Sequence, residues 1–222
     1  MVHVLGTLLS FDEMMVRFMG RSGETHRMKH KPIGEGYKLF TLTTFRGFIV
    51  NFTLDGRRAA KVKNNKDGKQ EYEMQEGIGK IQSMILHVCG VIDRFKQRQL
   101  DRFRTHRRST RNNLQDPLTE KQMTTFCIAM DNFFTLPSVM KTLRDKGIGA
   151  VGTARFKQNW PPKELKLIDK SQAEFNDFFY TYDDFGTLVA RWMDNGLVFL
   201  VSTIHRVNSI IERNRRRPRL TQ

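Results

Sequence analysis

Two stretches decide how this chain folds: Thr124-Thr125-Phe126-Cys127-Ile128-Ala129-Met130-Asp131 and Val4-Leu5-Gly6-Thr7-Leu8-Leu9-Ser10-Phe11-Asp12. Each is a short, mainly apolar run typical of a β-strand, and each ends in an aspartate. A carboxylate just past a buried strand is held rigidly and is costly to leave without a positive partner. Such a position suits a divalent metal, and it equally suits an acid that caps nearby backbone groups. The residues alone leave both interpretations open.

Two further strands are predicted next to the first stretch. Residues 37–44 alternate between apolar and polar side chains, and residues 48–54 are rich in β-branched and aromatic residues. Arg46-Gly47 lies between them and suits a tight hairpin turn. With the strand that ends at Phe11, they predict a three-stranded meander.

Helices and a last short strand follow this meander. Apolar residues recur at steps of three and four from Ile81 to Phe95, which predicts an amphipathic helix of about five turns. A second helix is predicted over residues 136–146, with Gly147 as its C-terminal stop. Residues 148–154 then form a strand. The order β-β-β-α-β-α-β predicts an α/β, ribonuclease-H-like fold, a mixed sheet flanked by helices.

A boundary is expected at the Pro161-Pro162 pair. We assign residues 1–160 to the ribonuclease-H-like core. Residues 161–222 form the start of a β-rich insertion with a basic tail. A hairpin is predicted within it over residues 188–204, because Asp194-Asn195-Gly196 supplies turn chemistry between two apolar runs.

Charge and cysteine content bound the function. Lys and Arg total 38 against 23 Asp and Glu, for a formal net charge of +15. This excess favours a polyanion: nucleic acid first, then an acidic membrane surface, with a merely soluble basic surface as the alternative. No apolar run approaches the roughly 20 residues that span a bilayer, and the N-terminus lacks a signal-peptide pattern. Cys89 and Cys127 are predicted to be reduced core residues of an intracellular protein.

Clustered arginines form the main candidate for DNA contact. Residues 94–111 hold one acid, Asp101, and eight basic side chains: Arg94, Lys96, Arg98, Arg102, Arg104, Arg107, Arg108 and Arg111. Such a stripe attracts phosphate backbones without reading sequence. It could also be only a solvated helix end and loop.

Three other features are weaker candidates. The terminal run includes Arg215, Arg216 and Arg217 and is either a DNA contact, a nuclear import signal or a tail with no role. His26 and His30 have helical spacing, but their segment is predicted to be extended and offers no third zinc ligand. Phe133 and Phe134 are expected in the core rather than on a substrate.

Three blocks of this sequence resemble the piggyBac family of DNA transposases. The first comprises Asp12-Glu13-Met14-Met15, Gly20-Arg21, Lys31-Pro32 and Gly36-Tyr37-Lys38. The second comprises Met130-Asp131-Asn132-Phe133-Phe134-Thr135-Leu136-Pro137 and Val151-Gly152-Thr153-Ala154-Arg155. The third comprises Trp192-Met193-Asp194-Asn195 and Leu200-Val201-Ser202-Thr203-Ile204-His205. The blocks occur in order, although residues 55–122 match poorly.

The resemblance implies a ribonuclease-H-like catalytic domain in which three aspartates bind two divalent metal ions and cut and rejoin DNA. The first two fall on Asp12 and Asp131, which are therefore the expected catalytic and metal-binding residues. The third lies downstream of the Trp-x-Asp-Asn block, and no aspartate follows His205 here. We therefore expect Mg²⁺ or Mn²⁺ to bind weakly or not at all.

Two main hypotheses follow from the resemblance. Either the chain belongs to a DDE-type transposase and is inert only because it is incomplete, or it is a non-catalytic, domesticated DNA-binding remnant. A basic RNA-binding protein without transposon ancestry is a third, weaker hypothesis. DNA is the expected partner and the nucleus the expected location, with no membrane. A homodimer, if one forms, is expected to use regions outside this chain.

Overall fold

The computed structural model describes residues 7–29, 31–55, 79–109, 125–155, 160, 162–165 and 173–207, with the backbone alone for residues 102–109. The strands are β1 (Leu8–Arg17), β2 (His26–Arg27), β3 (Glu35–Thr44), β4 (Ile49–Leu54), β5 (Cys127–Met130), β6 (Gly149–Ala154), β7 (Phe178–Tyr182), β8 (Leu188–Met193) and β9 (Leu197–Ser202). The helices are α1 (Lys80–Cys89), α2 (Val91–Ser109), α4 (Pro137–Asp145) and the 3₁₀ turn η1 (Lys163–Leu165).

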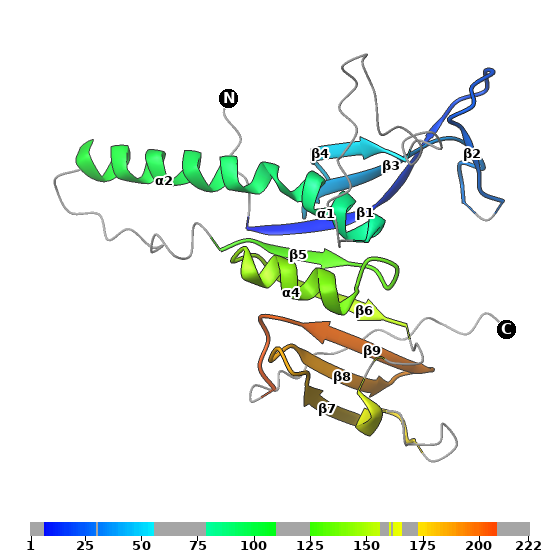
Figure 1. Ribbon diagram of the computed structural model, residues 1–222, viewed down its shortest axis with the longest axis vertical. Coiled ribbons are helices and arrows are strands. Elements are labelled where there is room, and N and C mark those ends of the chain that lie inside the picture. Colours follow the sequence, from blue (N-terminus) through cyan, green and yellow to red (C-terminus); the bar gives the residue numbers. More distant parts are fainter. Residues whose placement is uncertain are drawn as a thin grey trace, which may run out of the picture.

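One nine-stranded sheet runs through the structure in the order β2-β3-β1-β5-β6-β9-β8-β7, with β4 paired to β3 (Figure 1). β1 is antiparallel to β3 and parallel to β5, and β5 is parallel to β6. This mixed sheet and the order of its elements confirm the predicted ribonuclease-H-like arrangement. The division at residue 160 stays a prediction, and β9 continues the sheet by pairing antiparallel with β6.

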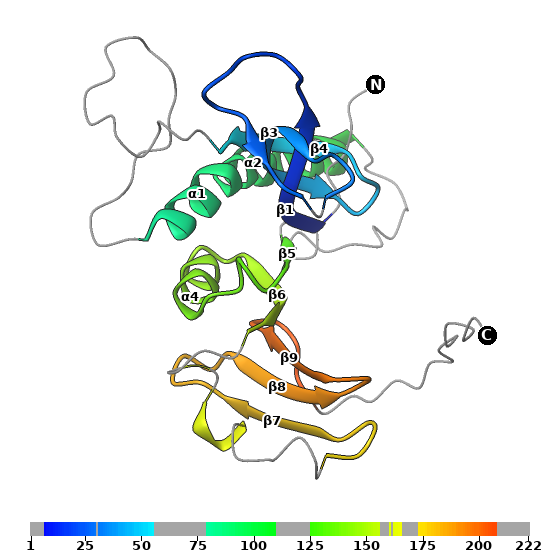
Figure 2. The same cartoon turned by 90° about the vertical axis from the view of Figure 1, so that its right-hand side faces the viewer.

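Helices α1 and α4 cover the same side of the sheet (Figure 2). The amide of Gln82 on α1 donates a 2.6 Å hydrogen bond to the hydroxyl of Thr142 on α4, which joins the two helices. The fully buried core between them and the sheet includes Phe11, Ile85, Ile128, Phe134, Met140 and Leu143. Burying side chains of this size contributes about 1.5–3 kcal/mol each. The predicted amphipathic patterns therefore identified the faces that form the core.

Tight turns appear where the sequence predicts them. Gly47 lies in the turn between β3 and β4 and has φ +82°. Gly147 follows the C-terminal end of α4 and has φ +65°. Both values lie in the left-handed region that glycine adopts without steric cost. The predicted hairpin of the insertion is confirmed as β8 and β9, and its turn is closed by a 3.1 Å bond from the Asp194 N–H to the Gly196 carbonyl.

The first predicted helix is wrong in its extent. It breaks at Gly90 into α1 and α2, and α2 continues to Ser109 rather than ending near Phe95. The Gly90 N–H bonds the His87 carbonyl at 3.3 Å, three residues back, which tightens the turn and interrupts the regular α-helical ladder. Glycine is also a poor residue for a helix interior, by about 1 kcal/mol relative to alanine.

The insertion contains one strand that the sequence pattern did not predict, β7. Its side chains are aromatic at almost every position, and Phe178, Phe179, Tyr180 and Tyr182 are all exposed. A run without apolar–polar alternation gives no period-two signal, so the pairing with β8 could not be inferred locally. Among the described residues, no helix is long and apolar enough to cross a membrane.

Cys89 and Cys127 are buried and free, as expected. Trp192 lies half-buried in the β7–β8 ladder, and its indole N–H donates to the Asn176 side chain at 3.0 Å. The expectation for the two phenylalanines is half right. Phe134 is fully buried, whereas Phe133 is 46% exposed.

Candidate metal centre at the end of β5

Asp12 and Asp131 are neighbours across the parallel ladder between β1 and β5. The ladder's last pair is Phe11 with Met130, and each aspartate is the next residue of its chain segment. Adjacent strands lie about 4.8 Å apart, so the two backbones are close at this point. Both aspartates are exposed. The structure therefore brings together the two acids that the sequence singled out.

The predicted position of Asp12 at a strand end is wrong. β1 does not stop at Phe11 but continues to Arg17, because its other side pairs with β3 as far as Arg17 and Gly36. Asp12 thus lies inside β1, at the point where β5 ends and β1 goes on beside β3 alone. The result is a notch in the sheet, bordered by Asp12 on one strand and Asp131 at the end of the other.

A compact turn fixes Asp131. Its side-chain Oδ1 accepts the Phe133 N–H at 2.8 Å, which is an Asx turn. Its carbonyl accepts the Thr135 hydroxyl at 2.7 Å and the Thr135 N–H at 3.1 Å. Phe134 anchors the turn to the core, because its fully buried ring packs against the rings of Phe11 and Phe40. The carboxylate is therefore held by its own backbone.

Asp12 is fixed by the strands on its β3 side. It pairs with Thr41, whose hydroxyl donates to the Asp12 carbonyl at 3.1 Å. Its Oδ1 accepts the N–H of Glu13 at 2.7 Å. Side chains alternate along a strand, so Asp12 lies on the face opposite Phe11, whereas Glu13 lies on the same face as Phe11 and Phe40.

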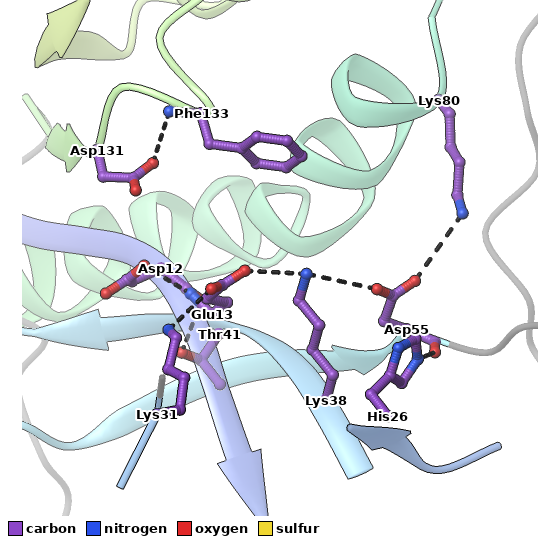
Figure 3. A network of polar contacts seen from close by, with 10 residues as sticks. All are labelled: Asp12, Glu13, His26, Lys31, Lys38, Thr41, Asp55, Lys80, Asp131 and Phe133. Atoms are coloured by element: carbon purple, nitrogen blue, oxygen red, sulfur yellow. Dashed lines mark hydrogen bonds and ion pairs between the residues drawn. The ribbon is translucent and has the colours of Figure 1, made fainter. Parts of the chain in front are cut away.

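Glu13 forms the centre of a charge network that sequence patterns missed (Figure 3). Its two carboxylate oxygens each contact one ammonium: Lys31 Nζ at 2.8 Å and Lys38 Nζ at 2.9 Å. Burial raises the pKa of Glu13, but the hydrogen bonds and charges of the two lysines outweigh it, and the net pKa lies below its ordinary value. Glu13 is thus committed to the lysines rather than available to a metal.

The pKa of Lys31 is also shifted by nearby acids. The hydrogen bond to Glu13 raises its pKa, partial burial lowers it, and the negative charges of Glu13, Asp12 and Asp131 raise it further. The net pKa of Lys31 lies above its ordinary value.

Lys38 extends the network away from the notch. The Lys38 ammonium lies 3.6 Å from the Asp55 carboxylate and 4.8 Å from the ring centre of Phe40. The Asp55 carboxylate is also 3.8 Å from the ammonium of Lys80. The imidazole Nε2 of His26 lies 2.7 Å from the Asp55 carbonyl. His26 is in the short extended strand β2, so the prediction of an extended segment there is confirmed; His30 lies outside the described residues.

The donor set at the notch fits one hard divalent ion. Carboxylate oxygens are the ligands that Mg²⁺ and Mn²⁺ prefer, and Mg²⁺ commonly completes its shell with water. Asp12 and Asp131 each accept a backbone N–H with Oδ1, and the Oδ2 atom of each carboxylate is the oxygen that could bind an ion. Within the described part of the chain, no cluster of three or more potential metal-binding side chains is present. Two ions in register would need a further ligand.

The arginine stripe lies mostly on α2. Arg94, Arg98 and Arg102 occur at steps of four along this helix, and the first two side chains are exposed. Lys96 is half-buried and its ammonium bonds the Lys146 carbonyl at 3.3 Å, so it serves the junction between α2 and α4. Arg104, Arg107 and Arg108 also fall within α2, whereas Arg111 and Arg215, Arg216 and Arg217 lie outside the described residues.

The lysine network had a weak signal in the sequence. Lys31 and Lys38 both belong to the first of the three blocks, next to a proline and a Gly-Tyr pair. Lys38 reaches Glu13 across the β1–β3 ladder, and Lys31 reaches it from the loop between β2 and β3. Local periodicity carries no information about such a contact.

The chain belongs to the family described as Transposase IS4, whose family model matches residues 1–222. Within this class its similarity is to piggyBac-derived proteins, which agrees with the resemblance to the piggyBac transposase family seen in the sequence.

Two human relatives illustrate the match. The chain is 28% identical over 198 residues to PiggyBac transposable element-derived protein 3, covering 89% of this chain and 27% of the relative. It is 26% identical over 199 residues to PiggyBac transposable element-derived protein 2, covering 87% of this chain and 26% of the relative. The chain thus spans about a quarter of the length of these relatives.

A solved structure shares the fold. The cryo-EM structure of the piggyBac transposase synaptic complex with hairpin DNA superposes with a TM-score of 0.62 at 17% sequence identity. The match covers 94% of this chain and 35% of the solved one. At this identity the likeness establishes the fold.

Proposed function

We propose that this chain is a DNA-binding, transposase-derived domain in which Asp12 and Asp131 hold a divalent ion at the notch beside β5. The observation that carries the proposal is their register: they follow directly on the last pair of the β1–β5 ladder. Family membership relates the chain to DNA transposition, and the two exposed carboxylates supply the oxygen ligands that such chemistry uses.

Each residue has a distinct task in this proposal. A bound Mg²⁺ or Mn²⁺ would act as a Lewis acid on a DNA phosphate. Asp131 is pre-oriented by the Phe133 N–H, and Asp12 by the Glu13 N–H, so neither carboxylate needs to reorganise to meet the ion. Glu13 is paired with Lys31 and Lys38 and is not assigned to the ion.

We further propose that this 222-residue chain does not cut DNA. Two aspartates offer at most four oxygens, and two of these already accept backbone N–H bonds. Two-metal catalysis needs ions about 3.5–4 Å apart, whose mutual repulsion must be offset by bound carboxylates. The test is incubation with Mn²⁺ and DNA bearing matched transposon ends. Metal-dependent nicking that disappears in Asp131→Ala would overturn this part of the proposal.

DNA binding is assigned to the exposed arginines of α2. Residues four apart lie on one face of a helix about 6 Å apart along its axis, so Arg94, Arg98 and Arg102 occupy positions on one face of α2, and Arg94 and Arg98 are exposed there. The solved neighbour is a complex with hairpin DNA, which supports DNA as the partner. Binding by such a row should depend strongly on salt and little on base sequence. Because DNA is the proposed partner, we also propose a nuclear location, which a fluorescent fusion protein would test.

The experiment is a salt titration of binding to duplex DNA. The triple change of Arg94, Arg98 and Arg102 to Ala should weaken binding and flatten the plot of log K against log salt by about 3 × 0.9. Arg17 and Arg46 are exposed arginines outside α2, and changing them to Ala should have a smaller effect on affinity and slope. Equal effects from the two sets would show that the stripe is only a solvated surface.

The non-catalytic remnant is the alternative function. It predicts the same salt-dependent DNA binding without a divalent-ion site. Asp12→Asn separates the two, because only the metal-binding proposal expects this change to abolish Mn²⁺ binding.

A further inference from the structure

Strand β7 forms one end of the nine-stranded sheet (Figure 1). It pairs with β8 on one side, and no strand of the described residues pairs with its other side. The N–H and C=O groups on that side therefore form a sheet edge. Natural proteins usually blunt such edges with lysine, proline or a bulge, and β7 contains none of these. An edge of this kind is suited to accept one further strand.

Three aromatic rings project from one face of this edge. Phe178, Tyr180 and Tyr182 occupy alternate positions of β7, so they share a face of the sheet. They are 45%, 51% and 47% exposed, and neighbouring ring centroids are 6.2 Å apart in both pairs. We call these three side chains the aromatic row. Contiguous exposed rings, unlike scattered ones, mark an interaction surface.

Four acids flank the aromatic row, Glu174 and Asp177 before it and Asp183 and Asp184 after it. Residues 173–190 contain no Lys or Arg, although the whole chain has a formal net charge of +15. Within the part of the chain that the structure describes, none of these four carboxylates forms an ion pair. This end of the sheet is therefore a local negative surface, which attracts cations and repels phosphate.

Rings next to the aromatic row already hold cations of this chain. The Arg191 guanidinium carbon lies 4.4 Å from the ring centre of Phe179, and the Lys141 ammonium lies 5.6 Å from that of Phe185. Both distances fall within the roughly 6 Å of a cation–π contact. Phe179 is on the opposite face of β7, and Phe185 lies in the turn to β8. Among the described residues, no cation lies over the aromatic row itself.

We propose that β7 is a docking edge for an extended, arginine- or lysine-bearing segment of a partner protein. The segment pairs with the outer side of β7 as an additional strand, and its cationic side chains lie over the aromatic row, between the flanking acids. In strand addition of this kind, main-chain hydrogen bonds give affinity and alternate side chains give specificity. The inference is independent of the proposed metal site and of DNA binding by α2.

The spacing of the aromatic row sets the chemistry of the partner segment. An added strand lies about 4.8 Å from β7, and its side chains alternate between the two faces of the sheet. Only every second residue of the segment therefore faces the aromatic row. Directly opposite side chains have Cβ atoms about 5 Å apart, so a cation there can reach a ring. We expect Arg or Lys at every second position of the segment, with small or β-branched residues between them.

Two other occupants fit the surface less well. Single-stranded nucleic acid also stacks on exposed rings, but its phosphates would meet the flanking acids. A second copy of this chain could pair β7 with β7. Antiparallel pairing centred on Tyr180 would place Asp177 of one copy opposite Asp183 of the other, and like charges directly opposite are destabilising. A basic segment has neither problem.

The test is fluorescence polarisation with a labelled peptide of about nine residues in which arginine and threonine alternate. The wild type should bind it at least about fivefold more tightly than a peptide of the same composition with all arginines in one block. Because the whole chain is strongly positive, general attraction of either peptide is disfavoured, so binding reports a local site. Equal affinity for the two peptides would contradict the proposed alternation.

Two changes in the protein, each with a matched control, locate the binding. Tyr180→Ser should weaken binding of the alternating peptide about three- to tenfold. Phe52→Ser removes a ring of similar exposure from β4 and should change it by less than about twofold. Asp184→Lys should weaken binding by about threefold or more, most strongly at low salt. Asp93→Lys makes the same charge change at an exposed position on α2 and should have a smaller effect. Circular dichroism checks the fold of each variant.

Hydrogen exchange tests the strand addition itself. The alternating peptide should slow exchange of β7 amides, residues 178–182, because side-chain contact alone does not protect a backbone N–H. Absence of this protection, or equal effects of the Asp184→Lys and Asp93→Lys changes, would overturn the proposal even if Tyr180→Ser fails to fold. Oligothymidylate binding that Tyr180→Ser abolishes would assign the aromatic row to nucleic acid instead. A dimer of the wild type that Tyr180→Ser dissociates would assign it to a second copy of the chain.

Discussion

The rings of Phe11 and Phe134 meet edge to face with centroids 4.9 Å apart. Phe11 directly precedes Asp12, and Phe134 belongs to the turn that begins at Asp131. One aromatic contact in the core therefore links the two segments that carry the exposed aspartates. Aromatic pairs in this geometry contribute about 0.5–1.5 kcal/mol beyond the area they bury.

Phe134→Ala is expected to reduce the free energy of unfolding by about 3–5 kcal/mol, because it empties a fully buried position under the Asp131 turn. Urea denaturation followed by circular dichroism measures the loss. Phe133→Ala is the matched control. Its ring is 46% exposed, so its loss should be about 1 kcal/mol or less. Similar losses for the two changes would contradict this account of the turn.

Gly152→Ala is expected to destabilise the protein by about 1–3 kcal/mol, which is the usual range for overpacking. Gly152 pairs with Met130, and a Cβ there would lie 2.6 Å from the Met130 carbonyl oxygen and even closer to the Thr135 hydroxyl. That hydroxyl donates to the Asp131 carbonyl, so the added methyl group would also disturb the turn.

Gly196→Ala is the control for this change. A Cβ at Gly196 meets nothing within 4 Å and its φ is not positive, so this change should be neutral or stabilise by about 0.5–1 kcal/mol. Thermal denaturation of both variants gives the comparison. A stable Gly152→Ala protein would show that the β5–β6 ladder has more room than the contacts indicate.

Arg191→Met is expected to leave the unfolding free energy unchanged or to raise it. Arg191 is 1% exposed, and its Nη2 has no hydrogen-bond partner among the described residues. The guanidinium donates to the Leu165 carbonyl at 3.3 Å, and it lies 4.4 Å from the centre of the Phe179 ring. A methionine keeps much of the packing without the desolvated charge. Arg191→Ala loses the packing too and should cost about 2–4 kcal/mol. A large loss in Arg191→Met would reveal a strong anionic partner.

Cys89 is expected to be unreactive toward iodoacetamide in the native protein at pH 8. Burial raises the pKa of its thiol from 9.0 to about 12, and the thiolate is the reacting form. Burial also raises the pKa of Cys127. Mass spectrometry should show both thiols labelled only after denaturation.

The same shift makes stability depend on alkaline pH. Above pH 9 the Cys89 thiol ionises in the unfolded chain but stays protonated in the folded one, so the unfolded state gains stability as pH rises toward 12. Cys89→Ala should therefore show a shallower loss of stability than the wild type between these pH values. Identical slopes would mean that the thiol is more accessible than its burial implies.

Patterns confined to one element predicted much of this fold. The β3–β4 hairpin could be predicted from the sequence because Gly47 supplies the turn between two strand-forming runs. The helix of residues 137–145 could be predicted from its apolar face and from Gly147, which follows its C-terminal end. In both cases the deciding interactions span only a few residues.

Features that depend on distant partners were not predictable in this way. The length of β1 is set by β3, which holds it as far as Arg17, and so the position of Asp12 inside a strand required knowledge of that pairing. The ion pairs of Glu13 likewise depend on partners distant in the sequence, because Lys38 lies across the β1–β3 ladder and Lys31 lies in the loop between β2 and β3. The register of Phe11 with Met130 explains why Asp12 and Asp131 follow directly on the last pair of the β1–β5 ladder; whether their carboxylates share an ion stays a prediction.

The pairing of β6 with β9 has a practical consequence. β5 occupies one side of β6, and β9 from the insertion occupies the other with bonds from Val151 to Ala154. A version of the protein shortened before β9 would expose the N–H and C=O groups of β6 along a flat row. Such rows recruit strands from other molecules and drive aggregation. The insertion therefore protects the core from self-association, and attempts to express the core by itself should include residues 197–202.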